Sequence, residues 1–231
     1  MHGVAGAVMP SRCFVIGDIH GCVRTFRRLV TEVIKLTAGD ELYLLGDLID
    51  RGPDSKGVLD FIFELRKQGF AVLSIKGNHE DMYLRSGNSQ QIMDMWLANG
   101  GRATLRSFNA DGPADIPYQY QYFLQSLPYY ILLKDFVIVH AALNFFRTDP
   151  FVDTEAMLWQ RDCIVDRARI GGRRLICGHT PVTREQLEDS LAADRIMLDN
   201  GSVFDERPGL GSLAALDLNR MVVFYQNNID R

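Results

Sequence analysis

The chain has 231 residues, 47% of them apolar, and carries a formal net charge of −4 at pH 7. A chain of this size can bury a large core in one domain or at most two, as is typical of a globular enzyme. Its acidic balance argues against nucleic acid as a partner, and no stretch approaches the roughly 20 apolar residues that span a bilayer. We therefore expect a cytoplasmic protein that binds neither nucleic acid nor a membrane.

The first eleven residues carry Ala, Gly and Val but no basic segment of the kind that begins a signal peptide. We expect residues 1–11 to form a flexible tail and residues 12–231 to form a single domain, because no linker, repeat or low-complexity tract divides the rest. A core of this size needs no disulfides, and the cysteines have no C-x-x-C spacing. We expect reduced thiols at Cys13, Cys22, Cys163 and Cys177.

Short apolar runs recur along the chain, and a polar motif follows most of them. They lie at residues 13–16, 42–45, 71–75, 136–139 and 175–177. Continuous apolarity over four or five residues is typical of strands that are covered on both faces. We therefore expect a strand at each run.

Two amphipathic segments separate the first three runs. The first places six apolar side chains on one helical face, at Val23, Phe26, Leu29, Val30, Val33 and Ile34. The second runs from about residue 55 to 68, with Asp54 or Ser55 as its cap and Gly69 at its end. The order strand, helix, strand, helix, strand predicts an α/β domain.

The middle of the chain, from about 90 to 127, lacks strand signals and is expected to be helical. Gly100-Gly101 and the loop at 109–117 should interrupt it. The last third returns to strands, at 195–198, 213–218 and 221–225, with turns between them. The class is thus α/β with α+β character.

Five short motifs rich in Asp, Asn and His stand out. They are Gly-Asp-Ile-His-Gly at 17–21, Gly-Asp-Leu-Ile-Asp-Arg-Gly at 46–52, Gly-Asn-His-Glu at 77–80, Val-His-Ala at 139–141 and Gly-His-Thr-Pro at 178–181. Ligands of an α/β sheet bind at the carboxyl ends of its strands, so these motifs can converge on one site. Their oxygen and nitrogen donors suit Mn, Fe or Zn, and there are enough of them for two metals.

Single motifs allow plainer interpretations. Asp18 could cap the following helix, and Asp47 could be a cap or turn residue, although Asp50 and Arg51 follow it within one loop. Arg161 could be a solvated helix arginine.

The histidine motifs have their own alternatives. Asn78-His79 could be an ordinary turn, and His140 could be a satisfied core histidine. His179 is the more exposed candidate. Because Asn78 and His79 are adjacent, we expect one to bind a metal and the other to react in that loop.

Taken in chain order, the five motifs resemble the signature of the metal-dependent phosphoprotein phosphatase (PPP) family. The small bacterial and phage branch, typified by bacteriophage lambda phosphatase, is the most similar. Three further segments also resemble that branch: Trp-Leu-Ala-Asn-Gly-Gly at 96–101, Leu-Trp-Gln-Arg at 158–161 and Leu-Asp-Asn-Gly-Ser-Val-Phe at 198–204. The similarity spans about residues 13–205 and implies a metallophosphoesterase β-sandwich flanked by helices, with a dimetal site at the carboxyl ends of its strands.

The resemblance also implies roles for individual residues. The first metal would be held by Asp18, His20 and Asp47, and the second by Asp47 as a bridge with Asn78, His140 and His179. His79 would be the general acid, oriented by Asp50. The phosphate would be bound by Arg51, Asn78 and Arg161.

The implied activity is hydrolysis of phosphomonoesters by in-line attack of a metal-bridging water or hydroxide. The expected enzyme is a serine/threonine protein phosphatase that acts on a phosphoprotein or phosphopeptide, with phosphotyrosine as an additional substrate. Two divalent ions are implied, Mn²⁺ above all, with Fe or Zn as alternatives at one site. Lys76, where arginine is usual, and Ala141-Ala142, where glycine is common, depart from the pattern and bear on the shape of the pocket.

Two other functions remain open. A symmetrical bis(5′-nucleosyl)-tetraphosphatase is a relative in the same superfamily, but its motifs are closer to Ala-Arg-Gly-Pro, Gly-Asn-His-Asp and Gly-His-Trp than to those of this chain. A catalytically dead phosphate-binding module is the second alternative, and the intact set of ligands, acid and arginines argues against it.

Overall fold

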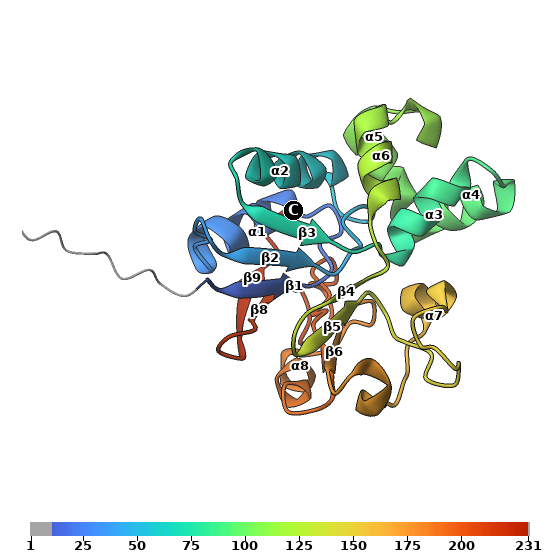
Figure 1. Cartoon of the computed structure of the whole chain (residues 1–231). Coiled ribbons are helices and arrows are strands. Elements are labelled where there is room, and N and C mark those ends of the chain that lie inside the picture. The colour runs from blue at the N-terminus through green and yellow to red at the C-terminus, as the bar shows by residue number, and fades with distance from the viewer. Residues whose placement is uncertain (1–10, 231) are drawn as a thin grey trace, which may run out of the picture.

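The computed structural model describes residues 11–230, and their strands form two sheets (Figure 1). The tail predicted over 1–11 therefore lies, except for Ser11, outside the described residues. The first sheet contains β1 (Cys13–Ile16), β2 (Glu41–Leu44), β3 (Ala71–Ser74), β8 (Ser212–Asp217) and β9 (Val222–Asn227) in the order β3-β2-β1-β8-β9. The second contains β4 (Tyr130–Leu132), β5 (Phe136–Val139), β6 (Arg174–Cys177) and β7 (Arg195–Met197) in that order.

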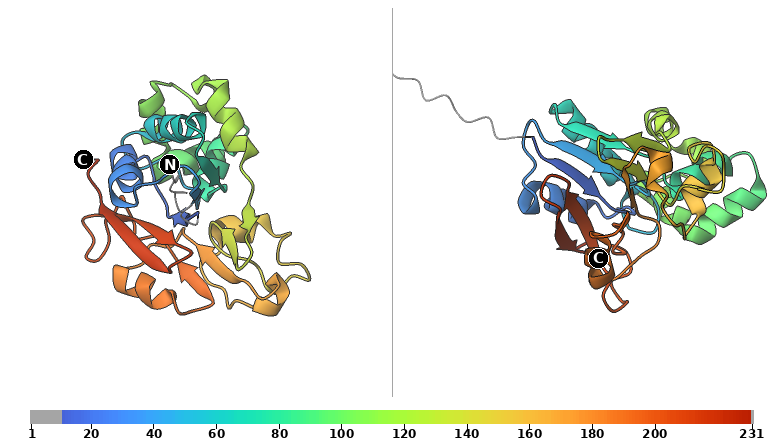
Figure 2. Two further views of the ribbon diagram at one scale, coloured as in Figure 1. Left: turned by 60° about the vertical axis from the view of Figure 1, so that its left-hand side comes forward. Right: turned by 60° about the horizontal axis from the view of Figure 1, so that its bottom comes forward.

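Parallel pairing brings the ends of distant strands together. In the first sheet β1 pairs in parallel with β2, and β2 with β3, while β8 runs antiparallel to both of its neighbours, β1 and β9. In the second sheet β5, β6 and β7 are parallel and β4 is antiparallel to β5. The C-terminal strands thus lie beside the first strand of the chain (Figure 2).

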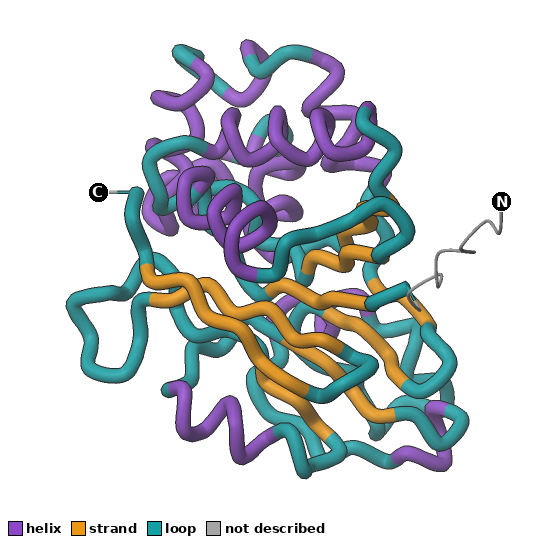
Figure 3. The backbone as a smooth tube through the Cα atoms, turned by 90° about the vertical axis from the view of Figure 1, so that its left-hand side faces the viewer, coloured by secondary structure: helices purple, strands orange, loops and turns teal. Residues whose placement is uncertain are grey.

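The two sheets pack face to face, and helices cover their outer sides (Figure 3). Side chains alternate along β1: Phe14 and Ile16 join the core under the helices, whereas Val15 packs between the sheets with Ile138 and Ile176. Successive side chains of a strand point to opposite faces, so the apolar residues in a row along β1 fill a core on each side of the sheet. The predicted α/β sandwich flanked by helices is confirmed.

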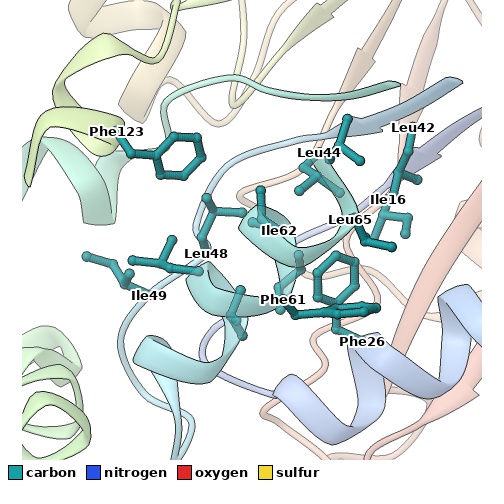
Figure 4. Packing of buried hydrophobic residues seen from close by; sticks show 14 of the residues in the cluster. Ile16, Phe26, Leu42, Leu44, Leu48, Ile49, Phe61, Ile62, Leu65 and Phe123 are labelled. Carbon is teal, nitrogen blue, oxygen red and sulfur yellow. The ribbon is translucent and has the colours of Figure 1, made fainter. Parts of the chain in front are cut away.

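The core on the helical side extends directly under the loop that follows β2 (Figure 4). Phe26 of α1 (Val23–Arg28) and Phe61 of α2 (Ser55–Lys67) stack edge to face, with ring centroids 5.2 Å apart. Leu48 and Ile49 are fully buried in the same cluster. Each such side chain contributes roughly 1.5–3 kcal/mol when buried, so the loop that carries Asp47 and Asp50 is anchored by its own apolar residues.

The helices of the middle region gather beyond one end of the first sheet (Figure 1). They are α3 (Asn78–Ser86), α4 (Gln90–Trp96), the π-helical turn η2 (Leu97–Gly101), α5 (Arg102–Phe108), the short η3 (Pro113–Asp115) and α6 (Tyr118–Ser126). The interruption predicted at Gly100-Gly101 is confirmed, because Gly100 has φ 113° inside the π turn. The remaining helical elements are η1 (Leu29–Val33), which continues α1, and α7 (Thr154–Trp159), η4 (Arg167–Ile170) and α8 (Arg184–Ser190).

The structure corrects the sequence-based expectation at four elements. Asn78 and His79 were expected in a loop, but they form the first turn of α3. Strand β4 and helices α7 and α8 were not predicted. Each of these has nine residues or fewer, and so short a segment carries too little periodicity to be recognised.

Two smaller expectations concern the cysteines and the membrane. All four cysteines are free, as predicted. Among residues 11–230, no helix is both long and apolar enough to cross a membrane.

Candidate functional site

The candidate residues follow the carboxyl ends of five strands. Asp18 and His20 come after β1, Asp47 after β2, Asn78 and His79 after β3, His140 after β5 and His179 after β6. Because these strands run in parallel within their sheets, their ends meet at one edge. All of these side chains except His179, which is partly exposed, are buried.

Asp47 lies at the centre of the cluster. Its Oδ2 is 3.5 Å from His20 Nε2 and 3.9 Å from His79 Nε2, and its Oδ1 is 3.4 Å from His140 Nε2. Two groups of three potential metal ligands therefore share this carboxylate. They are His20, Asp47 and His79, and Asp47, His140 and His179, with all ligand atoms of a group within 4.8 Å of one another.

Two histidines are oriented as metal ligands require. His20 Nδ1 lies 3.1 Å from the carbonyl of Ile49, and His140 Nδ1 lies 2.8 Å from the carbonyl of Leu45. A carbonyl can only accept, so each Nδ1 must donate, and each Nε2 keeps a lone pair that faces Asp47. Burial lowers the pKa of both side chains, which favours the neutral imidazole that binds metals.

The cluster around Asp47 includes three further polar residues, Asp18, Asn78 and His179. Asn78 Oδ1 is 2.9 Å from His140 Nε2 and 3.0 Å from His179 Nδ1. Asp18 Oδ2 accepts a hydrogen bond from the backbone N–H of His179 at 3.0 Å. Its buried Oδ1 and His179 Nε2 have no hydrogen-bond partner within residues 11–230.

Such buried atoms are costly unless a cation or a proton satisfies them. Burial, assisted by the charges of Asp199 and Asp47, raises the pKa of Asp18 well above its ordinary value. A buried carboxylate without a cationic partner, beside neutral imidazoles, is the donor set of a divalent cation. The residues present therefore fit a dimetal centre, although Asp18 lies outside both compact groups of three.

His79 and Asp50 form a buried pair. His79 Nδ1 is 2.7 Å from Asp50 Oδ2, and Asp50 is fully buried. Although burial lowers it, the pKa of His79 is raised on balance by the charge of Asp47 and the bond to Asp50. The other ring nitrogen, Nε2, has no hydrogen-bond partner in the described part of the chain, so a proton there can be exchanged with a reacting group.

The two candidate arginines differ in their surroundings. Arg51 Nη1 donates to His20 Nε2 at 2.7 Å, and its guanidinium lies 5.4 Å from the ring centre of Phe204. Arg161 is exposed. Burial and His140 lower the pKa of His179 to about 3, and the charge of Arg161 contributes to that shift. Arg51 therefore contacts a candidate metal ligand directly, whereas Arg161 lies close enough to His179 for its charge to help lower that side chain's pKa.

Glu80 was quoted with the Gly-Asn-His-Glu motif but was assigned no role. Its Oε2 accepts from the backbone N–H groups of Asp47 and Gly77, and its Oε1 from that of Leu48, each at 2.8 Å. This buried carboxylate ties the loop after β2 to the start of α3. The signal was available, because a glutamate three residues after Gly77 has the spacing of a capping box.

Asp199 is the second residue without a predicted role. It follows β7, is buried, and accepts from the N–H of Gly201 at 2.7 Å. Burial and the charge of Asp47 raise its pKa to about 7. Its position after a further parallel strand is the signal that could have identified it.

Lys76 and Ala141-Ala142 were singled out as departures from the family pattern. Lys76 Nζ lies 3.4 Å from the carbonyl of Gln125 and 5.1 Å from the ring centre of Tyr129. Both alanines are fully buried. Lys76 is thus engaged with the end of α6 and the residues after it.

Comparisons with known proteins identify a family for this chain. The family model described as calcineurin-like phosphoesterase matches residues 11–202. The chain is 32% identical over 199 residues to serine/threonine-protein phosphatase 1 of Salmonella typhimurium, covering 83% of this chain and 87% of that protein.

A second relative has a different named activity. The asymmetrical bis(5′-nucleosyl)-tetraphosphatase PrpE of Oceanobacillus iheyensis is 26% identical over 219 residues, covering 84% of this chain and 85% of that protein. Among solved structures, one titled a putative diadenosine tetraphosphatase superposes with a TM-score of 0.68 at 19% identity, over 97% of this chain and 96% of the other. At that identity the superposition supports the fold alone.

Proposed function

Because the chain belongs to the calcineurin-like phosphoesterase family and resembles its phosphoprotein phosphatases, we propose that this hydrolase is a dimetal-dependent serine/threonine protein phosphatase. The observation that carries the proposal is the single carboxylate of Asp47 shared by two groups of potential ligands, next to the His79–Asp50 pair. A bridging carboxylate with an adjacent proton donor suits hydrolysis of a phosphomonoester.

The proposed ligands are those that the family resemblance implies, and their side chains gather around Asp47. Asp18, His20 and Asp47 would hold one ion, and Asp47, Asn78, His140 and His179 the other. Two bound dications would supply positive charge for the phosphate and lower the pKa of a water aimed at phosphorus. Mn²⁺ is the proposed metal at both positions, with Fe or Zn as an alternative at one, because the donors are oxygen and nitrogen atoms only.

The chain's own residues handle the proton and the phosphate. Asp50 holds the Nδ1–H of His79, which leaves Nε2 to protonate the departing alkoxide of a serine or threonine. Arg51 and Arg161 would donate paired hydrogen bonds to the phosphoryl oxygens, with the amide of Asn78 as a further donor. A serine alkoxide is a poor leaving group, so proton donation by His79 contributes more for such a substrate than for one whose leaving group is already a stable anion.

A nucleotide substrate is the second candidate, because a relative named as a bis(5′-nucleosyl)-tetraphosphatase matches most of this chain. A dimetal centre on this fold would serve either reaction. The two are separated by what lies beyond the scissile phosphate, which is a peptide in one case and further phosphates in the other.

The test is a parallel assay of metal-stripped and Mn²⁺-restored protein. The substrates are a phosphoserine peptide, a phosphotyrosine peptide and bis(5′-adenosyl) tetraphosphate. We expect chelation to abolish phosphate release, Mn²⁺ to restore it, and kcat/KM to be highest for phosphoserine. Turnover by fully chelated protein would contradict the dimetal proposal, and a preference for the dinucleotide would overturn the substrate assignment alone.

A further inference from the structure

Among the residues of the site with positive φ, Asp50 and Arg51 are consecutive. Asp50 and Arg51 have φ values of 72° and 67°, in the left-handed region that residues other than glycine rarely adopt. Consecutive residues in this region persist only where surrounding structure holds them. The proposed function makes one of them the partner of the general acid and the other a phosphate ligand, so whatever holds them affects both tasks.

The carboxylate of Asp50 is held from the middle helical region. Trp96 Nε1, at the end of α4, donates to Asp50 Oδ2 at 2.9 Å, and Thr104 Oγ1, in α5, donates to Oδ1 at 2.6 Å. The N–H of Asp50 donates in turn to Thr104 Oγ1 and to Ser55 Oγ, both at 3.0 Å. All four residues are buried, so water cannot replace these bonds.

Arg51 is held by the turn between those two helices. Its N–H donates to the carbonyl of Gly100 at 3.3 Å. A Cβ on Gly100 would lie 2.7 Å from Arg51 N and 2.8 Å from Arg51 Cγ, and Gly100 has φ +113°. Only glycine allows so close an approach without displacing the arginine.

The adjacent glycine makes room for the indole. A Cβ on Gly101 would lie 2.5 Å from ring carbons of Trp96, so the ring could not keep its place beside any larger residue. Four residues thus act on Asp50 and Arg51, directly or through a neighbour: Trp96, Gly100, Gly101 and Thr104. The metal site by itself gives the Trp-Leu-Ala-Asn-Gly-Gly segment at 96–101 no role.

We propose that residues 96–104 form a positioning element that fixes Asp50, and through it the Nδ1–H of His79, while Gly100 fixes the backbone of Arg51. The inference rests on the proposed function, because it assigns to this element the placement of the acid and of one phosphate-binding arginine. It predicts two separable effects: loss of the Asp50 contacts impairs leaving-group protonation, and displacement of Arg51 weakens phosphate binding.

The first effect is tested with Thr104→Val, which keeps the shape of the side chain and removes its hydroxyl. We expect kcat on a phosphoserine peptide to fall about tenfold more than kcat on p-nitrophenyl phosphate, whose leaving group needs little protonation. Thr104→Ser, which keeps the hydroxyl, should restore both rates. Trp96→Phe should behave as Thr104→Val does.

The matched control is Tyr83→Phe. The ring of Tyr83 packs on Trp96 with centroids 5.4 Å apart, but its hydroxyl donates to the carbonyl of Pro113 and not to Asp50. This variant removes a hydroxyl from the same packing cluster and should leave the ratio of the two substrates unchanged. Equal losses on both substrates in Thr104→Val, or the same ratio change in Tyr83→Phe, would reduce the element to a merely structural role.

The second effect is tested with Gly100→Ala, paired with Gly87→Ala as control. A Cβ on Gly87 would meet no atom within 4 Å. We expect Gly100→Ala to raise the inhibition constant of inorganic phosphate and KM about tenfold while the metal content holds. Unchanged phosphate inhibition would show that Gly100 does not position Arg51.

A spectroscopic measurement separates this inference from the proposed function. A histidine N–H bound to a carboxylate gives a downfield proton resonance, which can be followed in the full chain with and without Zn²⁺. The resonance of His79 Nδ1–H should move in Thr104→Val and stay in Tyr83→Phe and Thr104→Ser. If the protein hydrolyses no phosphomonoester, the proposed function fails, whereas a resonance that does not move in Thr104→Val overturns the positioning element by itself.

Discussion

The loops that carry the two candidate arginines differ in how firmly they are held. The loop at 46–52 after β2 is held by Glu80, by Thr104 and by Gly100, and all of it except Arg51 is buried. The segment at 160–166 near the second sheet has no helix or strand, and Arg161 on it is exposed. A bond from Arg195 Nη2 to the carbonyl of Arg161, at 2.7 Å, anchors that backbone.

The difference suggests that the two loops have different tasks within one site. Groups that move a proton or hold a metal must stay within a few tenths of an ångström of their working positions, so they lie where backbone and side chains are fixed from several directions. A long exposed side chain can follow substrates of different shapes. We therefore expect substitutions that disturb Asp47 or Asp50 in the loop at 46–52 to change chemistry, and those that disturb Arg51 or Arg161 to change binding.

The largest effect is expected from His79→Asn. General acid catalysis is worth roughly a hundred- to ten-thousand-fold, so kcat on a phosphoserine peptide should fall by about a thousandfold and far less on p-nitrophenyl phosphate. Both metals should remain bound, as measured by elemental analysis. His79 Nε2 lies 3.9 Å from Asp47 Oδ2 within one of the compact ligand groups, so the loss of one metal would make His79 a ligand and refute its role as the acid.

Glu80→Gln should come next. The amide replaces one oxygen with a donor, so two of the N–H groups from Asp47, Gly77, Leu48 and Ile49 lose their acceptor. Removing a group that orients a metal ligand typically lowers metal affinity about ten- to a hundredfold. We expect Mn²⁺ titration to show a loss of affinity of that size in Glu80→Gln. The control is Asp54→Ala, which removes the carboxylate that caps α2 and should lower stability without changing metal affinity. Equal metal affinities in Glu80→Gln and wild type would show that the loop at 46–52 keeps its conformation without Glu80.

Arg161→Ala should have a smaller and different effect. Because Arg161 is exposed, its contribution is screened by salt, so we expect about a tenfold loss in kcat/KM at low salt and less at high salt, with metal content unchanged. Inorganic phosphate should also inhibit more weakly. Arg167→Ala removes the same charge from an exposed pair with Asp194; if it matched Arg161→Ala, general surface charge and not phosphate binding would explain the result.

The sequence predicted the strands well for a physical reason. At β1 and β5 the predicted residues, 13–16 and 136–139, are those observed, because a continuous apolar run between polar motifs has few other structures available to it. Asn78 and His79 were assigned to a loop and instead begin α3. Polar residues that favour helix starts also favour turns, so residue type alone does not separate the two.

The convergence of the motifs could be predicted from parallel strand ends, but the residues that hold them could not. Trp96 and Asp50 are separated by 46 residues, and Thr104 and Asp50 by 54. No local pattern encodes such a contact, because it depends on how α4 and α5 return to the sheet. All the assigned roles stay predictions: the metal-ligand roles of Asp18, His20, Asp47, Asn78, His140 and His179, the proton transfer by His79 and Asp50, and the phosphate binding by Arg51, Asn78 and Arg161.

The smallest effect on catalysis is expected at the opposite end of β2. Asp40 precedes that strand and is 4% exposed. It pairs with Arg12 at 2.6 Å and accepts from the N–H of Thr37 at 2.8 Å. Burial alone would raise the pKa of this carboxyl, but the bonds from Arg12 and Thr37 lower it to about 2.

Asp40→Asn should therefore change stability and leave kcat unaffected, in contrast to the variants at the carboxyl end of the strands. A carboxyl whose pKa falls on folding stabilises the native state above its unfolded pKa, near 4, and that contribution disappears as the pH falls toward about 2. We expect the variant to lose about 2 kcal/mol of unfolding free energy at pH 7, measured by urea denaturation, and the difference from wild type to shrink between pH 4 and pH 3. A loss of stability that is equal at pH 7 and pH 3 would mean that the carboxyl's charge is not what Arg12 stabilises, and a fall in kcat would mean that the amino end of β2 is coupled to Asp47 through the strand.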